Sequence, residues 1–288
     1  MDLEQPATLD LVQRLMSWSS RYVLVCGVMA PFQASLNALS AGRSVRHSTF
    51  PWSGAAKTAV RMCRALLALV AVNEKQHARS LQSFKKRTPT HVVVTDASLS
   101  QVGFLIFALT DSCETCLGGG AVSIAEYEFG GDSSNQNTAE FIGSMLGITA
   151  LVKLGVKDTG ILLRGDSMTA LKWSITGRLK GERGVNAAMA MSALCMNYSI
   201  DIVGTDFLAG VDNWQCDNLS RADQKGMSVK EMMEKNGLPG VRNVVIDDDP
   251  AVKKLLGACN PTMSIGSETE FSRVWGAIQS SVKELSRE

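Results

Sequence analysis

Four carboxylates stand where predicted strands end or predicted helices begin. Asp96 and Asp166 end the strand-like runs VVVTD and GILLRGD, while Glu140 and Asp217 lie in the first turns of predicted helices. Ligands of mixed sheets gather at such ends, so we expect three of these four ends to meet at one edge of a sheet. Clustered carboxylates repel one another, and a divalent cation removes that penalty. Oxygen ligands select Mg²⁺ or Mn²⁺, and two such ions can promote phosphodiester cleavage.

Each acid also has an ordinary structural explanation. Asp96 could be a turn residue, and Asp166 could cap the helix that follows it. Glu140 could be favoured by the positive end of a helix dipole, and Asp217 could simply face solvent. Taken singly, any of the four acids is explained as well by structure as by a metal site. The four together, in this order along the chain, favour the metal site.

Short β-branched segments and longer helical segments alternate after residue 90. The sequence predicts strands at 90–98, 102–109, 120–129, 159–166 and 198–208, helices at 138–155, 167–176, 184–197 and 211–224, and loops at 110–119 and 130–137. Three consecutive strands favour an antiparallel meander, and later strands reached through helices favour parallel pairing. The predicted fold is therefore α/β, a five-stranded mixed sheet flanked by helices.

The chain before this region is predicted to be mostly helical, and KKRTPT predicts a linker that ends near a proline. We expect four parts: a helical connection-like segment at 1–84, a linker at 85–90, the α/β domain at 91–225 and a C-terminal helical extension at 226–288. The acidic stretch VVIDDDP follows the α/β part and is predicted to form a turn.

Positive charge is concentrated in the first 90 residues, which hold 12 Lys and Arg against 4 acids. Lys57, Arg61 and Arg64 are three and four residues apart, which places them on one face of a predicted helix. Such a stripe could follow the phosphates of a nucleic acid. An ordinary solvated helix surface would have the same spacing, and the sequence leaves both interpretations open.

The composition is that of a globular protein, with 45% hydrophobic and 20% charged residues. The longest early apolar run, 22–32, is shorter than the roughly 20 residues of a membrane-spanning helix, and no signal-peptide pattern is visible. Cys113 and Cys116 form one CxxC, but a zinc site needs about four ligands and no second pair follows. We expect reduced cysteines, a location in the cytoplasm or nucleus, and no membrane partner.

The order of elements and four motifs resemble the ribonuclease H domain of retroelement reverse transcriptases. The motifs are VVVTDAS, NTAEFIGSMLGI, LLRGDSMTALKW and VDNWQCDNLSR, and the resemblance covers residues 90–225. The ending DNLSRA is similar to the last motif of long-terminal-repeat and DIRS-like elements. Residues 11–39 are similar to the segment that joins polymerase and ribonuclease H in DIRS-like and VIPER-like elements.

This resemblance implies an endonuclease that hydrolyses the RNA strand of RNA–DNA hybrids with two Mg²⁺ or Mn²⁺ ions. Its catalytic metal ligands would be Asp96, Glu140, Asp166 and Asp217. The first three would hold one ion, and the first and last would hold the other. Contacts to 2′-hydroxyl groups, which distinguish RNA from DNA, would come from Ser98, Gln101 and Asn137. The implied partners are the hybrid and a reverse transcriptase polymerase module.

Two departures from the family pattern bear on activity. Many ribonucleases H carry a loop His ten residues before the last Asp, and here that position is Phe207. A polymerase palm motif is absent, so we expect the chain to be the C-terminal piece of a reverse transcriptase. A second hypothesis is therefore an inactive ribonuclease H-like scaffold that binds nucleic acid or protein. A third, a resolvase or integrase of this fold, fits less well because an integrase order ends in Glu.

Overall fold

The structure of the 288-residue chain is a computed structural model. It describes residues 3–26, 36–37, 39–41, 43, 48–54, 56–57, 60–61, 64, 87–127, 129, 133–176, 184–260, 262–263 and 267–285. Three predicted features lie wholly or partly outside the described residues: the apolar run at 22–32, the start of the linker at 85–86, and most of the helix that follows residue 54.

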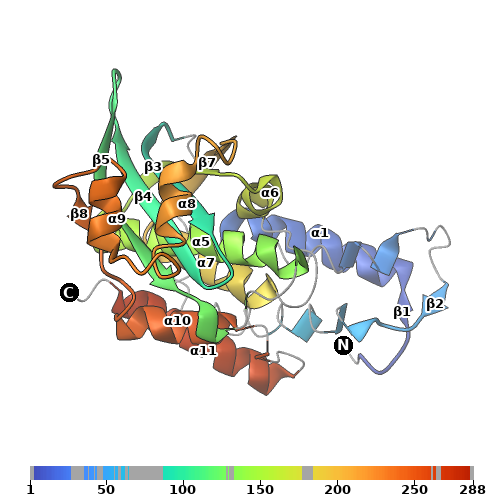
Figure 1. Ribbon diagram of the computed structural model, residues 1–288. Helices are drawn as coiled ribbons and strands as arrows, with labels where there is room; N and C mark the ends of the chain where they lie inside the picture. The colour runs from blue at the N-terminus through green and yellow to red at the C-terminus, as the bar shows by residue number, and fades with distance from the viewer. Residues whose placement is uncertain are drawn as a thin grey trace.

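A mixed sheet of six strands lies at the centre of the described part of the chain, in the order β7-β6-β3-β4-β5-β8 (Figure 1). Its strands are β3 (Pro89–Ala97), β4 (Gln101–Leu109), β5 (Glu114–Ser123), β6 (Thr159–Gly165), β7 (Ile200–Phe207) and β8 (Arg242–Asn243). The first three pair antiparallel, whereas β6 pairs parallel with β3, and β7 with β6. The predicted α/β mixed sheet, with a meander followed by parallel strands, is confirmed. It has six strands and not the predicted five, because β8, in the segment predicted to be helical, pairs parallel with β5.

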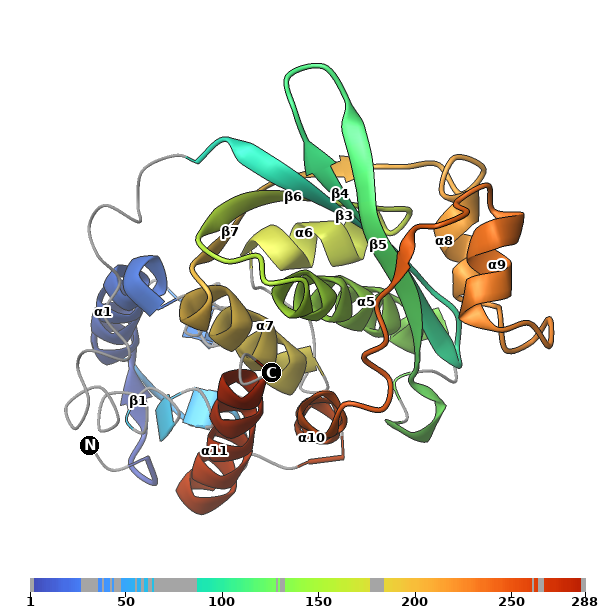
Figure 2. The same ribbon diagram turned by 90° about the vertical axis from the view of Figure 1, so that its left-hand side faces the viewer.

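Helices cover both faces of this sheet (Figure 2). One face packs against α5 (Ser133–Lys153), with α6 (Met168–Thr176) and α7 (Val185–Asn197) beside it, and the other against α8 (Trp214–Leu219) and α9 (Val229–Lys235). Successive residues of a strand point to opposite faces. Val93 and Phe104 accordingly join the apolar core under α5, while Val94 and Leu105 join the smaller cluster under α8.

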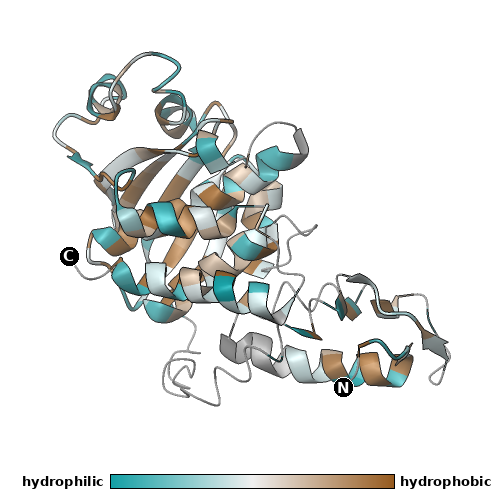
Figure 3. Cartoon of the chain, turned by 90° about the horizontal axis from the view of Figure 1, so that it is seen from below, coloured by the Kyte–Doolittle hydropathy of each residue, from teal (hydrophilic) through white to brown (hydrophobic). Residues whose placement is uncertain are grey.

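The C-terminal helices pack on α7, and their apolar residues belong to the main core. They are α10 (Pro250–Cys259) and α11 (Glu268–Glu284). Side chains define where they begin: Asp249 accepts backbone hydrogen bonds at the start of α10, and Ser267 with Glu270 forms a capping box at the start of α11. Seen from below in Figure 3, these helices carry both apolar and polar residues, as expected for helices that bury one side.

The N-terminal part contributes a two-stranded sheet and one long helix to the described residues. They are β1 (Ala7–Thr8), α1 (Leu9–Cys26) and β2 (Thr49–Phe50). Trp52 is buried, and its indole N–H donates a hydrogen bond to the carbonyl of Gln5. This bond joins the segment before α1 to the segment after β2. None of the helices in the described residues is both long and apolar enough to cross a lipid bilayer.

Three predicted boundaries were wrong. The sequence predicted a loop at 110–119, but β5 begins at Glu114, because the backbone there pairs with β4 despite its polar and glycine-rich composition. Ala125–Tyr127, predicted as strand, is a short 3₁₀ helix. The long helix begins at Ser133, inside the predicted loop 130–137, so Glu140 lies in its second turn and not its first. Gln136 stabilises this polar start because its amide donates a hydrogen bond to the carbonyl of Ala97.

Candidate metal centre

Three of the four predicted carboxylates meet at one edge of the sheet. Asp96 lies near the end of β3, Asp166 follows β6 directly, and Glu140 projects from α5 across the face. One oxygen of each side chain lies within 4.8 Å of the others. Parallel neighbouring strands end at the same edge of a sheet, so the pairing of β3 with β6 brings the two aspartates together. The contact between α5 and β3 adds the glutamate.

Burial makes the charged forms of two of these acids costly. Asp96 is 4% exposed, and burial is the main reason why its pKa is raised from 3.8 to about 6. The charges of Asp166 and Asp217 raise that pKa further, whereas a hydrogen bond from Ser220 lowers it. The hydroxyl oxygen of Ser220 lies 2.6 Å from Oδ2 of Asp96. The site therefore holds a carboxylate that is desolvated, repelled by its neighbours and oriented by a hydroxyl.

Glu140 is perturbed more strongly. It is 6% exposed, and burial followed by the charges of Asp96 and Asp166 raises its pKa from 4.5 to about 8. Two hydrogen bonds oppose this shift: the amide of Gln136 donates to Oε1 at 3.1 Å, and the backbone of Ala97 also contributes. With its pKa at about 8, Glu140 retains a proton near neutral pH unless a cation balances the charge of the cluster.

Asp166 stands at the more accessible side of the cluster, where its pKa is also raised, first by burial and then by the charge of Asp217. Gly210, in the loop after β7, comes close enough that a Cβ there would lie 3.7 Å from Oδ2 of Asp166. Hard carboxylate oxygens, mutual repulsion and partial access to solvent together fit a divalent cation such as Mg²⁺ or Mn²⁺. Asp96, Glu140 and Asp166 are the residues that could hold it.

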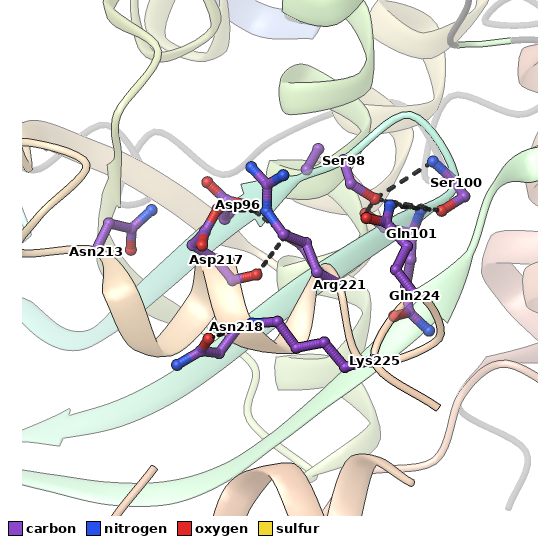
Figure 4. Close-up of polar contacts among 12 residues, drawn as sticks. Asp96, Ser98, Ser100, Gln101, Asn213, Asp217, Asn218, Arg221, Gln224 and Lys225 are labelled. Atoms are coloured by element: carbon purple, nitrogen blue, oxygen red, sulfur yellow. Dashed lines mark hydrogen bonds and ion pairs between the residues drawn. The ribbon is translucent and has the colours of Figure 1, made fainter. Parts of the chain in front are cut away.

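Asp217 lies near this group but is turned to a different partner. Its Oδ1 accepts a hydrogen bond at 2.7 Å from Nε of Arg221, one turn further along the chain (Figure 4). Its charge raises the pKa of both Asp96 and Asp166, which places it beside the cluster. Arg221 in turn lowers the pKa of both aspartates. Arg221 was not among the predicted site residues; its i, i+4 spacing from Asp217 is the sequence signal that identifies it.

The residues predicted to contact 2′-hydroxyl groups lie near the same edge, and their side chains have protein partners. Ser98 is buried, and its hydroxyl accepts hydrogen bonds from the backbone N–H groups of Ser100 and Gln101. The side-chain oxygen of Gln101 accepts from the backbone of Asp223, so the β3–β4 turn is joined to the segment after α8. Asn137, on α5, accepts a hydrogen bond from Ser167.

One residue of the predicted basic stripe, Lys57, pairs with an acid of the same chain. The ammonium group of Lys57 lies 2.9 Å from Oε1 of Glu4, so much of its charge is balanced within the chain. Arg61 is half-buried and Arg64 is exposed. Their binding to nucleic acid stays a prediction.

Phe207 and the CxxC pair add no ligand to the cluster. Phe207, at the end of β7, is 52% exposed. Cys113 and Cys116 are free thiols. Cys113 directly precedes β5, and Cys116 lies on it. Among the described residues, the group of side chains close enough together to hold a metal ion consists of the three carboxylates above, without these cysteines.

Comparisons with known proteins give structural neighbours only. No family model matches the chain, and no curated protein matches it. Solved structures similar to it include RNase H1 from Halobacterium salinarum, at 14% identity and a TM-score of 0.36, covering 47% of this chain and 96% of that one. Another is the N-terminal RNase H domain of a Mycobacterium tuberculosis protein, at 19% identity and a TM-score of 0.33, covering 48% and 96%. The strand order and pairing described above define the fold.

Proposed function

We propose that the protein is a metal-dependent endonuclease that hydrolyses the RNA strand of RNA–DNA hybrids. The observation that carries the proposal is the convergence of Asp96, Glu140 and Asp166, from three separate elements, on one desolvated point. Such a cluster is unfavourable by itself, since each buried charge raises the pKa of its neighbours. A cluster of buried carboxylates that is unfavourable by itself is most simply explained by a reaction that depends on a bound cation.

The four acids would together bind two ions. Asp96, Glu140 and Asp166 would hold one ion, and Asp96 with Asp217 the other, after Asp217 leaves Arg221. Two bound ions would supply a reactive water and stabilise the leaving oxygen of a phosphodiester. Ser220 orients Asp96, and Gln136 orients Glu140, so both carboxylates are fixed before any ion arrives. Arg221 would then be a cation beside the position of the scissile phosphate.

The choice of an RNA–DNA hybrid rests on the resemblance of the sequence motifs to retroelement ribonucleases H. The turn at 98–101 and Asn137 flank the cluster, and we propose them as contacts to the RNA strand. A reverse transcriptase polymerase module of a DIRS-like element is the proposed partner, and the cytoplasm or nucleus is the proposed location. The proposed parts of the chain remain 1–84, 85–90, 91–225 and 226–288.

The test is cleavage of an end-labelled hybrid by the purified chain in Mg²⁺ or Mn²⁺. The wild-type chain should cleave the RNA strand and leave the DNA strand intact. Asp166→Asn should abolish the cleavage of the RNA strand. Asp158→Asn is a suitable control, because Asp158 lies at the other end of β6 and pairs with Arg87. Equal cleavage by wild type and Asp166→Asn would reject the proposed site.

A second candidate function is a ribonuclease H-like scaffold that binds nucleic acid or protein without cutting. Phe207 favours it, since a hydrocarbon side chain stands where many ribonucleases H carry a loop His. In the same assay, this function would give hybrid binding with no cleavage in either metal. Binding can be followed separately by a gel shift in Ca²⁺, which occupies oxygen sites readily.

A further inference from the structure

Helix α8, which carries Asp217, is held against β3 by hydrogen bonds to three consecutive residues. The thiol of Cys216 lies 3.5 Å from the carbonyl of Val94, and the amide of Asn213 donates to the carbonyl of Thr95 at 3.0 Å. The third bond runs from Ser220 to the carboxylate of Asp96. The position of α8 along β3 is therefore fixed at the end of the strand that supplies the most buried aspartate.

A glycine in β4 allows this close approach. Gly103 is the β4 partner of Asp96. A Cβ at this position would lie 2.5 Å from the carbonyl oxygen of Cys216 and 2.6 Å from the backbone nitrogen of Ser220. Backbone thus packs directly on backbone, and the helix cannot slide or tilt without losing its hydrogen bonds to β3.

Ser220 connects the two aspartates directly. It has no exposed surface, and its hydroxyl oxygen lies 2.6 Å from Oδ2 of Asp96 and 2.9 Å from the carbonyl oxygen of Asp217. A hydroxyl has a single proton to donate, and a bond to a carboxylate is stronger than one to a neutral carbonyl. The proton therefore goes to Asp96, which fixes Oδ2 and leaves Oδ1 for other contacts.

Asn213 supports the same arrangement from the other end of the helix. Asn213 is 2% exposed, and its backbone carbonyl oxygen accepts a hydrogen bond from the backbone N–H of Asp217 at 3.0 Å. Asp217 thus lies between two buried side chains, Asn213 and Ser220, that both attach to the end of β3. Within the described residues the side-chain oxygen of Asn213 has no hydrogen-bond partner.

We infer that Ser220 is a positioning residue for a divalent-cation site shared by Asp96 and Asp217. Its hydroxyl orients the Asp96 carboxylate and sets the distance between the two aspartates through α8. The inference rests on the proposed function, because it assigns a role within that metal site. Outer partners that orient a metal ligand typically change affinity by about 10- to 100-fold when removed.

The test measures Mn²⁺ binding to the full chain without nucleic acid, by the loss of the free Mn²⁺ signal in electron paramagnetic resonance. Ser220→Ala should weaken binding about 10-fold. Ser281→Ala is the matched control: Ser281 is also fully buried and donates to a backbone carbonyl, that of Ala277, but it lies on α11. This variant should bind Mn²⁺ as the wild type does, even where thermal unfolding shows that both variants are destabilised.

A second variant weakens the hydrogen bond but keeps a donor at this position. Ser220→Cys keeps a side chain of the same shape, whose sulfur is a larger atom and a weaker donor, so it should bind Mn²⁺ less tightly than the wild type. Wild-type affinity in a folded Ser220→Ala or Ser220→Cys protein would overturn the inference and leave the proposed function standing. A wild-type chain that binds no Mn²⁺ would overturn both.

Discussion

Asp217 and Arg221 form an ion pair at the mouth of the acid cluster, with Oδ1 and Nε 2.7 Å apart. The hydrogen bond with Asp217 raises the pKa of the guanidinium, which also interacts with the charges of Asp96 and Asp166. The cluster therefore carries a counter-ion supplied by its own helical segment. A divalent cation that uses Asp217 must compete with this arginine.

The competition predicts that removal of Arg221 strengthens metal binding. Both side chains are partly exposed, and exposed ion pairs contribute about 0.2–1 kcal/mol, so Arg221→Gln should tighten Mn²⁺ binding only about 2- to 5-fold. Titration calorimetry of the chain without nucleic acid measures this. Lys225→Gln is the control, because Lys225 is the next cation along the segment and its ammonium group bonds to Asn218 instead. Weaker Mn²⁺ binding by Arg221→Gln would show that the arginine supports the site and does not compete for it.

The raised pKa of Glu140 predicts a pH-dependent stability in the absence of metal. The unfolded chain releases the proton of this residue near 4.5, and the folded chain near about 8. Between these values the folded state binds more protons, so the free energy of unfolding should fall as pH rises. Asp96, with its pKa at about 6, adds to the same trend over a narrower range.

Urea unfolding at pH 5 and pH 8.5 in the presence of a chelator measures this dependence. Glu140→Gln should flatten it, because the amide does not titrate. Glu234→Gln, at an exposed glutamate of α9, should leave the wild-type dependence unchanged. A wild-type chain whose stability rises from pH 5 to pH 8.5 would contradict the assignment of these buried acids.

The close packing at Gly103 predicts a large effect from one added methyl group. Gly103→Ala places a Cβ against the backbone of Cys216 and Ser220, so it should destabilise the fold by about 1–3 kcal/mol and separate α8 from β3. Gly257→Ala is the control, since Gly257 lies in α10 with nothing within 4 Å of an added Cβ. That change should stabilise the chain by about 0.5–1 kcal/mol. Equal stability of the two variants would show that α8 is not held where the structure places it.

The contacts of Arg87 predict a structural role for this residue within the predicted linker 85–90. Its guanidinium pairs with Asp158 at 2.7 Å and Asp201 at 3.0 Å and donates to the carbonyl of Ser199, so it joins the turns before β6 and β7. Arg87→Ala should cost about 1–3 kcal/mol of unfolding free energy by chemical denaturation. Arg14→Ala, which removes a largely exposed helix pair with Asp10, should change it by less than about 0.5 kcal/mol. An unchanged free energy of unfolding in Arg87→Ala would mean that other contacts hold the segment before β3.

The sequence determined the type and order of the main strands and helices from β3 to α8, and with them three members of the acid cluster. Short β-branched and apolar runs identified β3 and β6, and the parallel pairing of strands joined through helices followed from chain connectivity. These local rules were sufficient to place Asp96 and Asp166 at the ends of strands, and the pairing of β3 with β6 makes those ends neighbours. Glu140 was assigned correctly to the long helix, although its turn was wrong because the contact of Gln136 with Ala97 extends that helix towards its N-terminus.

Only the tertiary structure decided how the cluster is supported. The hydrogen bond of Ser220 with Asp96 joins residues 124 positions apart, and Gly103 is needed for it only because α8 packs on β4. The balance of charge likewise depends on burial, which raises the pKa of Glu140 to about 8 while Arg221 stays near solvent. Local propensity and periodicity describe a residue and its near neighbours along the chain. Desolvation, close backbone packing and long-range hydrogen bonds exist only once distant segments are brought together.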